Sequence, residues 1–512
     1  MSADALLDSL GDLLIVGIPG TELTGETEAV LRRIRPAGAI LFSENYVDAD
    51  GAARLTRSLH AILGTPDLPE LLAVDEEGGV VSRIAHFWEV PPSARAVASS
   101  GGPPLVRDLA ARTARRLLAL GFNLDFAPCA DIHSDPANPV IGVRSFGETA
   151  SQVTACVRAA IEGFQSTGVI PVVKHFPGHG DTAIDSHVAL PRVLADERLL
   201  ARRDLKPFEG AIQIGVPMVM TGHVLVPALD PDPTRTATLS HAIVTGLLRE
   251  RMRFAGVVVT DALEMAGATS LGSYGEVAVR AIEAGVDLLL YSKLSPGPEE
   301  AIAALREALA SGRIAPERIA QSLDRMRRLR AGNAARPAPW SPELARHARD
   351  LIGAEELTRV AEGAIRVLRQ GAGGLPLKPP VEVLEMNRSE NRAPLADLLR
   401  ASGMEAREHA PDPGSWPLRI SGTALLTVAA RSELPPELAE TARAWLRRFP
   451  ETVTIASLNP QVCDTWPEVR TLLTTFDNGP AARRALVKLL TAPHPSSVAV
   501  RRRARPPETP AA

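Results

Sequence analysis

The sequence predicts an α/β protein in which a (β/α)8 barrel of the TIM type is followed by a smaller α/β sandwich domain. With 512 residues, the chain is too long for one ordinary core. Short apolar runs rich in β-branched residues alternate with helical patterns over the first two-thirds of the chain, which is typical of parallel βα units. After Arg330 this alternation stops and a different pattern begins.

The number of apolar runs decides between the two architectures that parallel strands allow. Eight runs precede Arg330, and they span residues 13–20, 37–44, 71–77, 122–132, 169–175, 216–224, 256–263 and 284–292. Eight strand–helix units favour a closed barrel. A doubly wound open sheet remains the alternative, because boundaries drawn from patterns alone are imprecise.

The stretches between the runs have helical spacing. Val106, Leu109, Leu117 and Leu120 fall on one face of a predicted helix. Ser240 is placed to cap another helix, because its side-chain oxygen can accept a hydrogen bond from a free N–H group at the helix start. Helices therefore separate the predicted strands.

The region after Arg330 predicts a second domain joined by a Pro-rich linker. The linker covers residues 334–341, a helix starts near Pro342, and strands at 381–384, 422–429 and 453–458 accompany a helix at 435–448. The predicted boundaries are 1–333 for the catalytic barrel, 334–350 for the linker and leading helix, 351–500 for the C-terminal domain and 501–512 for a flexible tail.

Composition and charge exclude several classes of protein. The formal net charge of −4 gives no field that would attract DNA or an anionic membrane, and the arginines at 501–505 are interpreted as part of a solvated tail. Cys129, Cys156 and Cys463 lack the spacing of a disulfide framework or a zinc knuckle. The N-terminus has no leader pattern. We therefore expect a cytoplasmic protein with no nucleic-acid or membrane partner.

Polar and ionisable residues gather at or just after the ends of the predicted strands. In a barrel these ends converge on one face, where active sites are built. The residues are Asp75, Arg83, Asp131, Arg144, Lys174, His175, His223 and Asp261.

Asp261 follows three valines and a threonine at the end of the seventh predicted strand. A carboxylate in this position is partly shielded from water and held on a rigid element, which suits nucleophilic attack on a sugar carbon. The alternative is a helix cap, because aspartate is favoured there and a helical pattern follows.

The segment K-H-F-P-G-H-G-D-T-A-I-D-S-H-V-A-L-P, residues 174–191, predicts a long loop over the barrel mouth, which its glycines and proline leave free to move. Three interpretations remain open from the residues alone. The histidines and aspartates could bind a metal, or Asp185 could orient His187 for acid/base catalysis. The third interpretation is a purely structural loop.

Two further segments carry charges suited to a sugar. Asp75 and Arg83 flank a glycine pair that allows a tight turn, and Arg144 ends a loop that starts at Asp131. Carboxylates accept hydrogen bonds from sugar hydroxyls, and arginine or lysine donates them. A buried ion-pair network at the barrel rim is an equal alternative.

The segment at 174–191 closely resembles the signature of the bacterial β-N-acetylglucosaminidase branch of glycoside hydrolase family 3. The resemblance extends over the barrel and continues more weakly into the second domain. Its motifs are D-E-E-G-G at Asp75, N-L-D-F-A-P-C-A-D-I at Asn123, R-S-F-G at Arg144, M-T-G-H-V at Met220, T-L-S at Thr238 and T-D-A-L-E-M-A-G-A at Thr260.

The resemblance implies a role for each matching residue. Asp261 would be the nucleophile, and His187 paired with Asp185 would be the acid/base. The ring of N-acetylglucosamine would be held by Asp75, Arg83, Arg144, Lys174 and His175. The family requires no metal and no cofactor.

The sequence departs from the family pattern at three positions. Val80 follows the glycine pair where arginine is common, Val143 replaces an aspartate before Arg144, and Ala262 replaces an aspartate after the nucleophile. None of these changes removes a residue with an assigned chemical role. They leave the leaving-group preference and the polarity of the pocket open.

The expected function is a retaining exo-β-N-acetylglucosaminidase acting on a small saccharide in the cytosol. Peptidoglycan fragments are the expected substrate, with chitin-derived oligosaccharides as the alternative. Because a neutral imidazole does not repel an anion, phosphate could replace water and make the enzyme a phosphorylase. A metal-dependent barrel hydrolase and a non-catalytic sugar-binding protein also remain open.

Overall fold

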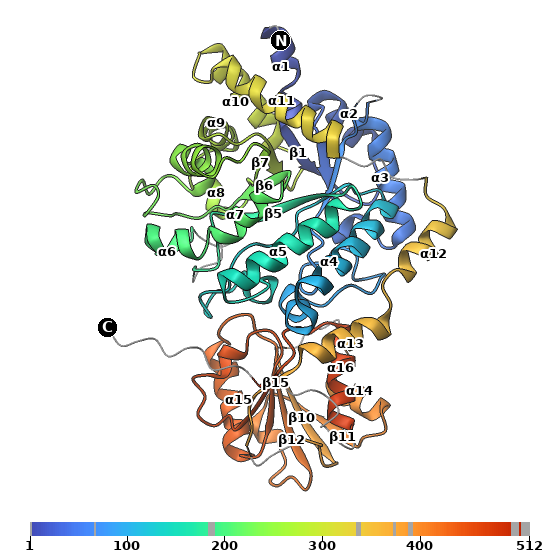
Figure 1. Cartoon of the computed structure of the whole chain (residues 1–512). Helices are drawn as coiled ribbons and strands as arrows, with labels where there is room; N and C mark the ends of the chain where they lie inside the picture. The colour runs from blue at the N-terminus through green and yellow to red at the C-terminus, as the bar shows by residue number, and fades with distance from the viewer. Residues whose placement is uncertain are drawn as a thin grey trace. The chain divides into compact units, whose positions relative to one another are not determined.

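The computed structural model describes residues 3–65, 68–182, 190–333, 339–371, 375–387, 393–492 and 501–502. The chain divides into two compact units (Figure 1). The barrel unit comprises Met1–Val90, Pro103–Ile141 and Ser145–Gly353. The C-terminal unit comprises Pro91–Gly102, Gly142–Arg144 and Ala354–Ala512.

Eight parallel strands form the sheet of the barrel unit. They are β1 Leu14–Gly17, β2 Gly38–Ile40, β3 Leu71–Val74, β4 Leu124–Asp125, β5 Ile170–Phe176, β6 Met218–Thr221, β7 Val257–Thr260 and β8 Leu289–Tyr291. The strand order is β7-β6-β5-β4-β3-β2-β1-β8, and a parallel bridge between Val259 and Leu288 joins the two ends. The predicted barrel is therefore confirmed, and the open doubly wound sheet was wrong.

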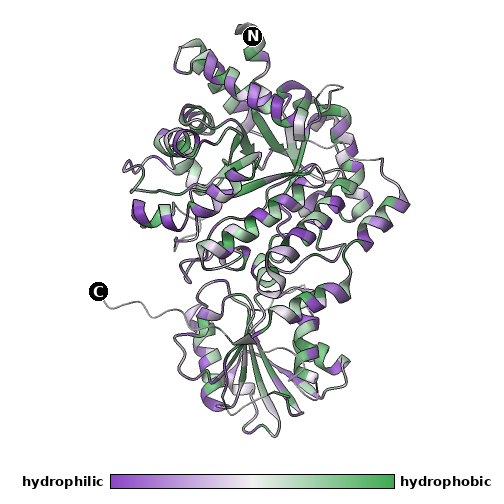
Figure 2. Ribbon diagram, viewed as in Figure 1, coloured by the Kyte–Doolittle hydropathy of each residue, from purple (hydrophilic) through white to green (hydrophobic). Residues whose placement is uncertain are grey.

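Every residue of these eight strands is buried. Strands buried on both faces are apolar throughout, which is why they could be recognised as apolar runs in the sequence. Strand side chains that point inward from around the sheet form one cluster, including Ile15, Ala73, Val172, Met218 and Val259. Figure 2 shows the strands in hydrophobic colours and the helices with mixed faces. The barrel interior is a packed core that holds the strand ends rigidly.

Helices connect the strands and surround the sheet. They are α1 Ala3–Asp8, α2 Gly25–Ile34, α3 Ala49–Leu63, α4 Ala94–Leu120, α5 Ala150–Gln165, α6 Glu197–Arg202, α7 Lys206–Gln213, α8 Ala266–Thr269, α9 Tyr274–Ala284, α10 Gly297–Ala310, α11 Pro316–Asn333 and α12 Pro342–Asp350. Short 3-10 helices are η1 Leu10–Leu13, η2 Ser43–Asn45, η3 Gly142–Arg144 and η4 Ala237–Leu239, and η5 Ala242–Arg251 is a π-helix.

The predicted helix over 106–120 is the second part of α4, which is kinked at Gly102 where φ is 62°. Two prolines follow this glycine, and neither can donate a backbone hydrogen bond. The Oγ atom of Ser240 accepts a hydrogen bond from the N–H of Ile243 at 3.2 Å, three residues on, as a capping residue does. The helix start predicted at Ser240 is therefore confirmed.

The C-terminal unit is built on a second sheet. Its strands are β9 Arg366–Arg369, β10 Val381–Met386, β11 Ala406–His409, β12 Thr423–Val428, β13 Val453–Ala456, β14 Thr471–Thr474 and β15 Arg501–Arg502. The order is β11-β10-β12-β13-β14-β9-β15, with β9 antiparallel to β14 and the other pairs parallel. The three strands predicted from the sequence correspond to β10, β12 and β13.

Helices cover both faces of this sheet, with α15 on one side and α14 and α16 on the other (Figure 1). Their bounds are α13 Ala354–Ala364, α14 Leu395–Ala401, α15 Pro436–Arg448 and α16 Pro480–Thr491, with 3-10 helices η6 Pro413–Ser415 and η7 Pro460–Cys463. The buried aromatic rings of Trp416, Trp445 and Phe449 pack together in its core. This is the α/β sandwich expected.

The predicted linker and the predicted tail lie partly outside the described residues. Residues 334–338 of the predicted linker lie outside the described residues, whereas α12 begins at Pro342 as expected. Arg501–Arg502, at the start of the predicted tail, pair with β9 as strand β15. Among the described residues, no helix is both long enough and apolar enough to cross a membrane.

Candidate active site

The carboxyl ends of β3, β5 and β7 bring together most of the residues that the sequence singled out. Asp75 directly follows β3, Lys174 and His175 lie near the end of β5, and Asp261 directly follows β7. All three strands are parallel members of the barrel sheet, so these side chains share its carboxyl face.

Lys174 is the centre of a buried charge network between β5 and the loop after β3. Its Nζ lies 2.7 Å from Oδ1 of Asp75 and 2.8 Å from Oε1 of Glu77, and its side chain is only 3% exposed. Arg83 approaches the same carboxylate, with Nη2 at 3.7 Å from Oδ2 of Asp75. Asp75 and Arg83 remain partly exposed, so they can still meet a solute in the mouth.

A tight turn after β3 delivers Arg83 to this network. Gly78 and Gly79 have φ values of 81° and 56°, which glycine adopts without strain, and Gly78 pairs with Val81 across the turn. Oε2 of Glu76 accepts hydrogen bonds from the backbone N–H of Arg83 and the hydroxyl of Ser82, both at 2.8 Å. The tight turn expected at the glycine pair is confirmed.

Glu76 is a buried residue of the candidate site that the sequence analysis did not single out. Burial raises its pKa to about 7, although the hydrogen bonds from Ser82 and Arg83 act in the opposite direction. Its neighbour Asp125 is also buried, and burial raises the pKa of that carboxyl well above its usual range. The motif D-E-E-G-G displays both glutamates, but only the fold shows which one faces the turn.

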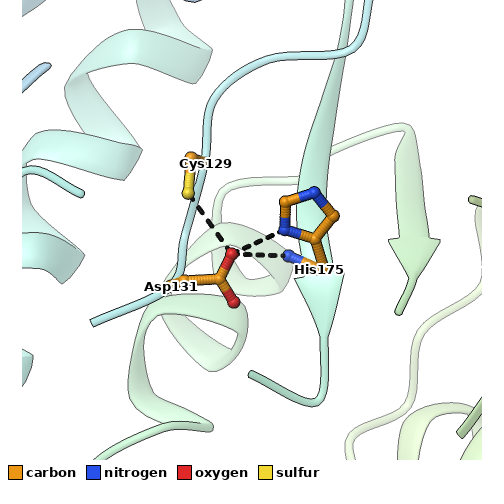
Figure 3. A group of neighbouring side chains, drawn as sticks. All are labelled: Cys129, Asp131 and His175. Atoms are coloured by element: carbon orange, nitrogen blue, oxygen red, sulfur yellow. Dashed lines mark hydrogen bonds and ion pairs between the residues drawn. The ribbon is translucent and has the colours of Figure 1, made fainter. Parts of the chain in front are cut away.

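Asp131 fixes the imidazole of His175 (Figure 3). Its Oδ2 lies 2.6 Å from Nδ1 of His175 and accepts hydrogen bonds from the His175 backbone N–H at 3.2 Å and the Cys129 thiol at 3.3 Å. Burial favours the neutral acid, but the charge and hydrogen bonds of His175 and His179 outweigh it and lower the Asp131 pKa to about 2. Asp131 is therefore a carboxylate that orients the imidazole of His175.

Cys129, Asp131 and His175 carry atoms that could also ligate a metal, and those atoms lie within 4.8 Å of one another. The distance between Oδ2 of Asp131 and Nδ1 of His175 is that of a direct hydrogen bond. In this arrangement the three residues position an imidazole. The expectation of no metal stays a prediction.

The first part of the loop after β5 is buried and tied to the loop after β4. The backbone N–H of His179 donates to Oδ1 of Asp131 at 2.6 Å, and Nδ2 of Asn138 donates to the His179 carbonyl at 2.8 Å. Asn138 also accepts from the N–H groups of Val140 and Ile141. The described residues 177–182 are thus hydrogen-bonded to the neighbouring loop, and the expected mobility of the segment at 174–191 stays a prediction.

Three predicted site residues cannot be placed at the strand ends. Asp185 and His187 lie outside the described residues, so the acid/base assignment stays a prediction. Arg144 lies in η3, a segment of the C-terminal unit, and is half-buried. Its contact with a sugar also stays a prediction.

Asp261 is not a helix cap. The next helix, α8, begins five residues later with Met265 in the capping position, whereas Oδ1 of Asp261 accepts from the adjacent Ala262 N–H at 2.8 Å. Burial, the strongest single influence, raises its pKa, but the charges of His175, His223 and Lys174 together with the Ala262 N–H lower it overall. Asp261 is therefore a carboxylate held on a rigid strand end. Ala262 contributes only backbone atoms here.

His223, at the end of β6, lies against the same loop. Its Nε2 is 3.1 Å from the carbonyl oxygen of Ala262 and its Nδ1 is 3.0 Å from the Thr238 hydroxyl. Burial lowers its pKa, and because a carbonyl oxygen only accepts, Nε2 is the donor in this contact. The sequence placed His223 at a strand end but gave it no role.

Glu264 connects this loop to the loop after β8. Its two carboxylate oxygens accept hydrogen bonds from the backbone N–H groups of Ser292 at 3.0 Å and Lys293 at 2.9 Å. Burial raises its pKa, whereas these donors act in the opposite direction. The sequence analysis did not single out Glu264, because its partners are backbone groups far along the chain.

Comparison with known proteins identifies the family of the chain. The profile of the glycosyl hydrolase family 3 N-terminal domain matches residues 6–329. β-Hexosaminidase A of Pseudoalteromonas piscicida is 34% identical over 391 residues, which cover 72% of this chain and 64% of that protein. β-Hexosaminidase of Methylococcus capsulatus is 36% identical over 300 residues, which cover 58% of this chain and 86% of that protein.

A solved structure extends the similarity to both units. The glycoside hydrolase family 3 β-N-acetylglucosaminidase from Paenibacillus sp. str. FPU-7 superposes with a TM-score of 0.85 at 33% sequence identity, covering 98% of each chain. The similarity therefore includes the α/β sandwich as well as the barrel.

Proposed function

Because the chain belongs to glycosyl hydrolase family 3, we propose that it is a retaining exo-β-N-acetylglucosaminidase that releases terminal β-linked N-acetylglucosamine. The similar proteins are named for β-hexosaminidase or β-N-acetylglucosaminidase activity. The observation that carries the proposal is that Asp261, a carboxylate with a lowered pKa, lies on the same barrel face as Asp75, Lys174 and His175, which we propose to bind the sugar.

The neighbours of Asp261 suit it to act as the nucleophile. The charges of His175, His223 and Lys174 favour its anionic form, which is the form that attacks an anomeric carbon. The hydrogen bond from the Ala262 N–H leaves its second carboxylate oxygen for the attack. The attack forms a covalent glycosyl-enzyme while the bond to the leaving oxygen breaks.

The network on the opposite side of the mouth suits the hydroxyl groups of the sugar ring. Asp75 accepts hydrogen bonds, whereas Lys174 and Arg83 donate them, and these groups already hold one another in place. His175, oriented by Asp131 through Nδ1, is proposed to contact the same ring. Such preorganised donors and acceptors distinguish one sugar from its isomers.

The acid/base step is assigned to His187 with Asp185 as its charged partner, and Arg144 is proposed to complete the hydroxyl contacts. Protonated His187 would give its proton to the departing oxygen, and neutral His187 would then take a proton from the incoming water. Water attack on the glycosyl-enzyme would release the sugar with its β configuration retained.

Product analysis tests the proposal directly. An aryl β-N-acetylglucosaminide should be cleaved, and NMR recorded during the reaction should show the β anomer first. Formation of the α anomer as first product would overturn double displacement. The same experiment with inorganic phosphate separates the two acceptors, because a phosphorylase would yield a sugar 1-phosphate.

The identity of the leaving sugar separates the two expected substrate classes. Peptidoglycan fragments present an anionic muramic acid at this position, whereas chitin-derived oligosaccharides present a neutral or cationic amino sugar. Charged side chains around the barrel mouth would favour one of these two classes of leaving sugar over the other.

A further inference from the structure

We propose that a groove between the loops after β1 and β8 binds the leaving sugar, and that its charge selects a neutral or cationic sugar over an anionic one. The groove has a volume of about 1160 Å³ and lies within the barrel unit. This inference rests on the proposed glycosidase function and names the substrate class of that same site.

The groove opens at the carboxyl face of the barrel. Its walls include Ile18 after β1, Phe42 after β2 and Ser292 after β8, so it begins beside the strand ends that carry the candidate active site. It extends outward between the first turns of α2 and α10, which supply Glu26 and Glu299. A second sugar ring fits easily in a groove of this size.

Two contacts join the groove to the candidate active site. The guanidinium carbon of Arg83 lies 5.5 Å from the ring centre of Phe42, so one groove wall supports a proposed sugar-binding residue. On the other side, Glu264 binds the backbone of Ser292 and Lys293 and lies three residues after Asp261. Residues that line the groove therefore contact residues on both sides of the barrel mouth.

The groove lies beside the reacting end of the sugar. The residues proposed to hold the sugar hydroxyls come from β3 and β5, whereas the proposed nucleophile follows β7. Because Asp261 must reach the anomeric carbon, that carbon lies near the end of β7. In the barrel β8 neighbours β7, and β1 and β2 follow, so the groove lies next to the carbon that carries the leaving sugar.

The charges that line the groove are predominantly negative. Four glutamates stand against two basic residues, and Arg33 is already paired with one of the glutamates, Glu299. The charged side chains are Glu22, Glu26, Glu44, Glu299, Arg33 and Lys293. A carboxylate on the leaving sugar meets net repulsion here, whereas an ammonium group meets attraction.

The test uses three disaccharides that share a non-reducing N-acetylglucosamine and differ in the leaving sugar. The leaving sugars are N-acetylglucosamine, which is neutral, glucosamine, which is cationic, and N-acetylmuramic acid, which is anionic. We expect kcat/KM to be roughly three- to tenfold lower for the anionic sugar than for the neutral one, and the gap to narrow at high salt. Equal values, or a preference for the anionic sugar, would overturn the proposal.

Reversing the charge of groove residues tests whether the groove causes the preference among leaving sugars. The double variant Glu22→Lys/Glu44→Lys should shift the ratio of kcat/KM towards the anionic sugar, and using a ratio removes any change in overall activity. Glu317→Lys, an exposed residue of α11 outside the groove, is the matched control and should leave the ratio unchanged. An unchanged ratio in the double variant, or an equal shift in the control, would contradict the groove assignment.

An aryl β-N-acetylglucosaminide keeps the two proposals separate. If the wild-type protein cleaves neither the aryl substrate nor any disaccharide, the glycosidase function itself fails. If it cleaves the aryl substrate and the disaccharides show no dependence on charge, only the groove proposal fails.

Discussion

The two sides of the barrel mouth differ in how far their charges are removed from water. On the side of β3 and β5, the Lys174 side chain is 3% exposed and touches two carboxylates. On the side of β8, β1 and β2, Glu22, Glu44 and Lys293 are exposed. Buried charges interact strongly and must be paired, whereas exposed charges are screened. The first side is therefore suited to holding the reacting sugar, and the second to a modest preference among leaving sugars of different charge.

This comparison predicts large effects at the charges of the first side and small effects at exposed charges elsewhere. The largest effect is expected at the proposed nucleophile. Asp261→Ala should lower kcat on an aryl β-N-acetylglucosaminide by about 10³-fold or more, because the covalent step is lost. Steady-state kinetics measures the loss, and added azide should restore turnover by giving a glycosyl azide of α configuration.

Near-normal turnover of Asp261→Ala would show that another residue is the nucleophile. Glu264→Gln is the matched control, because it is a nearby acid that the proposed mechanism does not use in a covalent step. Its amide oxygen can accept one of the two hydrogen bonds that the Ser292 and Lys293 N–H groups now donate to separate carboxylate oxygens, and azide should not change its product.

The second effect concerns Asp131, whose loss would leave His175 buried without its charged partner. Asp131→Asn should lower the free energy of unfolding by about 3 kcal/mol. Because the folded-state pKa of about 2 is below the ordinary value of 3.8, the stabilisation is present above pH 4 and is lost as the pH falls towards 2. Urea unfolding of both proteins at pH 7 and at lower pH measures this difference.

Asp232→Asn is the control for Asp131, because it makes the same chemical change at a surface loop. Its unfolding free energy should stay within about 0.5 kcal/mol of the wild type. Equal losses in the two variants would show that burial of Asp131 does not matter.

The third effect is a pH dependence carried by Glu76. Its folded-state pKa of about 7 is above the ordinary value of 4.5, so its contribution to stability is complete below pH 4.5 and is lost as the pH rises to 7. Glu76→Gln keeps an oxygen that can accept from Ser82 and Arg83 but does not titrate. The stability of the wild type relative to this variant should fall by about 2–3 kcal/mol over that range.

Thermal or urea unfolding across this pH range measures the Glu76 effect. A constant difference between the two proteins would rule out titration of Glu76. Glu76→Ala should in addition raise KM, because the turn that presents Arg83 loses its central acceptor.

The smallest effect is expected for an exposed ion-pair network. Arg313 contacts Glu276 and Glu283 at 2.8–2.9 Å, yet its side chain is 41% exposed. Arg313→Ala should change the unfolding free energy by at most about 1 kcal/mol, since exposed pairs gain little over hydration. A loss as large as that of Asp131→Asn would contradict the role given to burial.

The fold was predictable because its strands are buried on both faces and therefore read as apolar runs. The fourth strand shows where this fails. The run at 122–132 predicts a long strand, but β4 covers only Leu124–Asp125. Pro128 has no N–H to donate to the ladder, and the Asp131 carboxylate takes the backbone N–H groups of His175 and His179. Side-chain hydrogen bonds thus replace the regular ladder where the site begins.

The sequence predicted which residues lie at the strand ends of the candidate site. It did not predict which of them form ion pairs and hydrogen bonds with one another. Asp75, Lys174, His175 and Asp261 were identified by their positions after apolar runs. The partners of these residues, such as Glu77 for Lys174 and Asp131 for His175, come from other strands. No local pattern specifies which of two adjacent glutamates points at a lysine about 100 residues away.

The sequence by itself determined the eightfold alternation, the second domain and the types of residue at the barrel mouth, because these depend on local periodicity and on short motifs. Only the tertiary structure decided which charges are buried, which are paired and which remain in water. It also showed that the loops after β1 and β8 enclose a negative groove. Protonation states and substrate preference depend on distances and solvation, and these are properties of the folded chain.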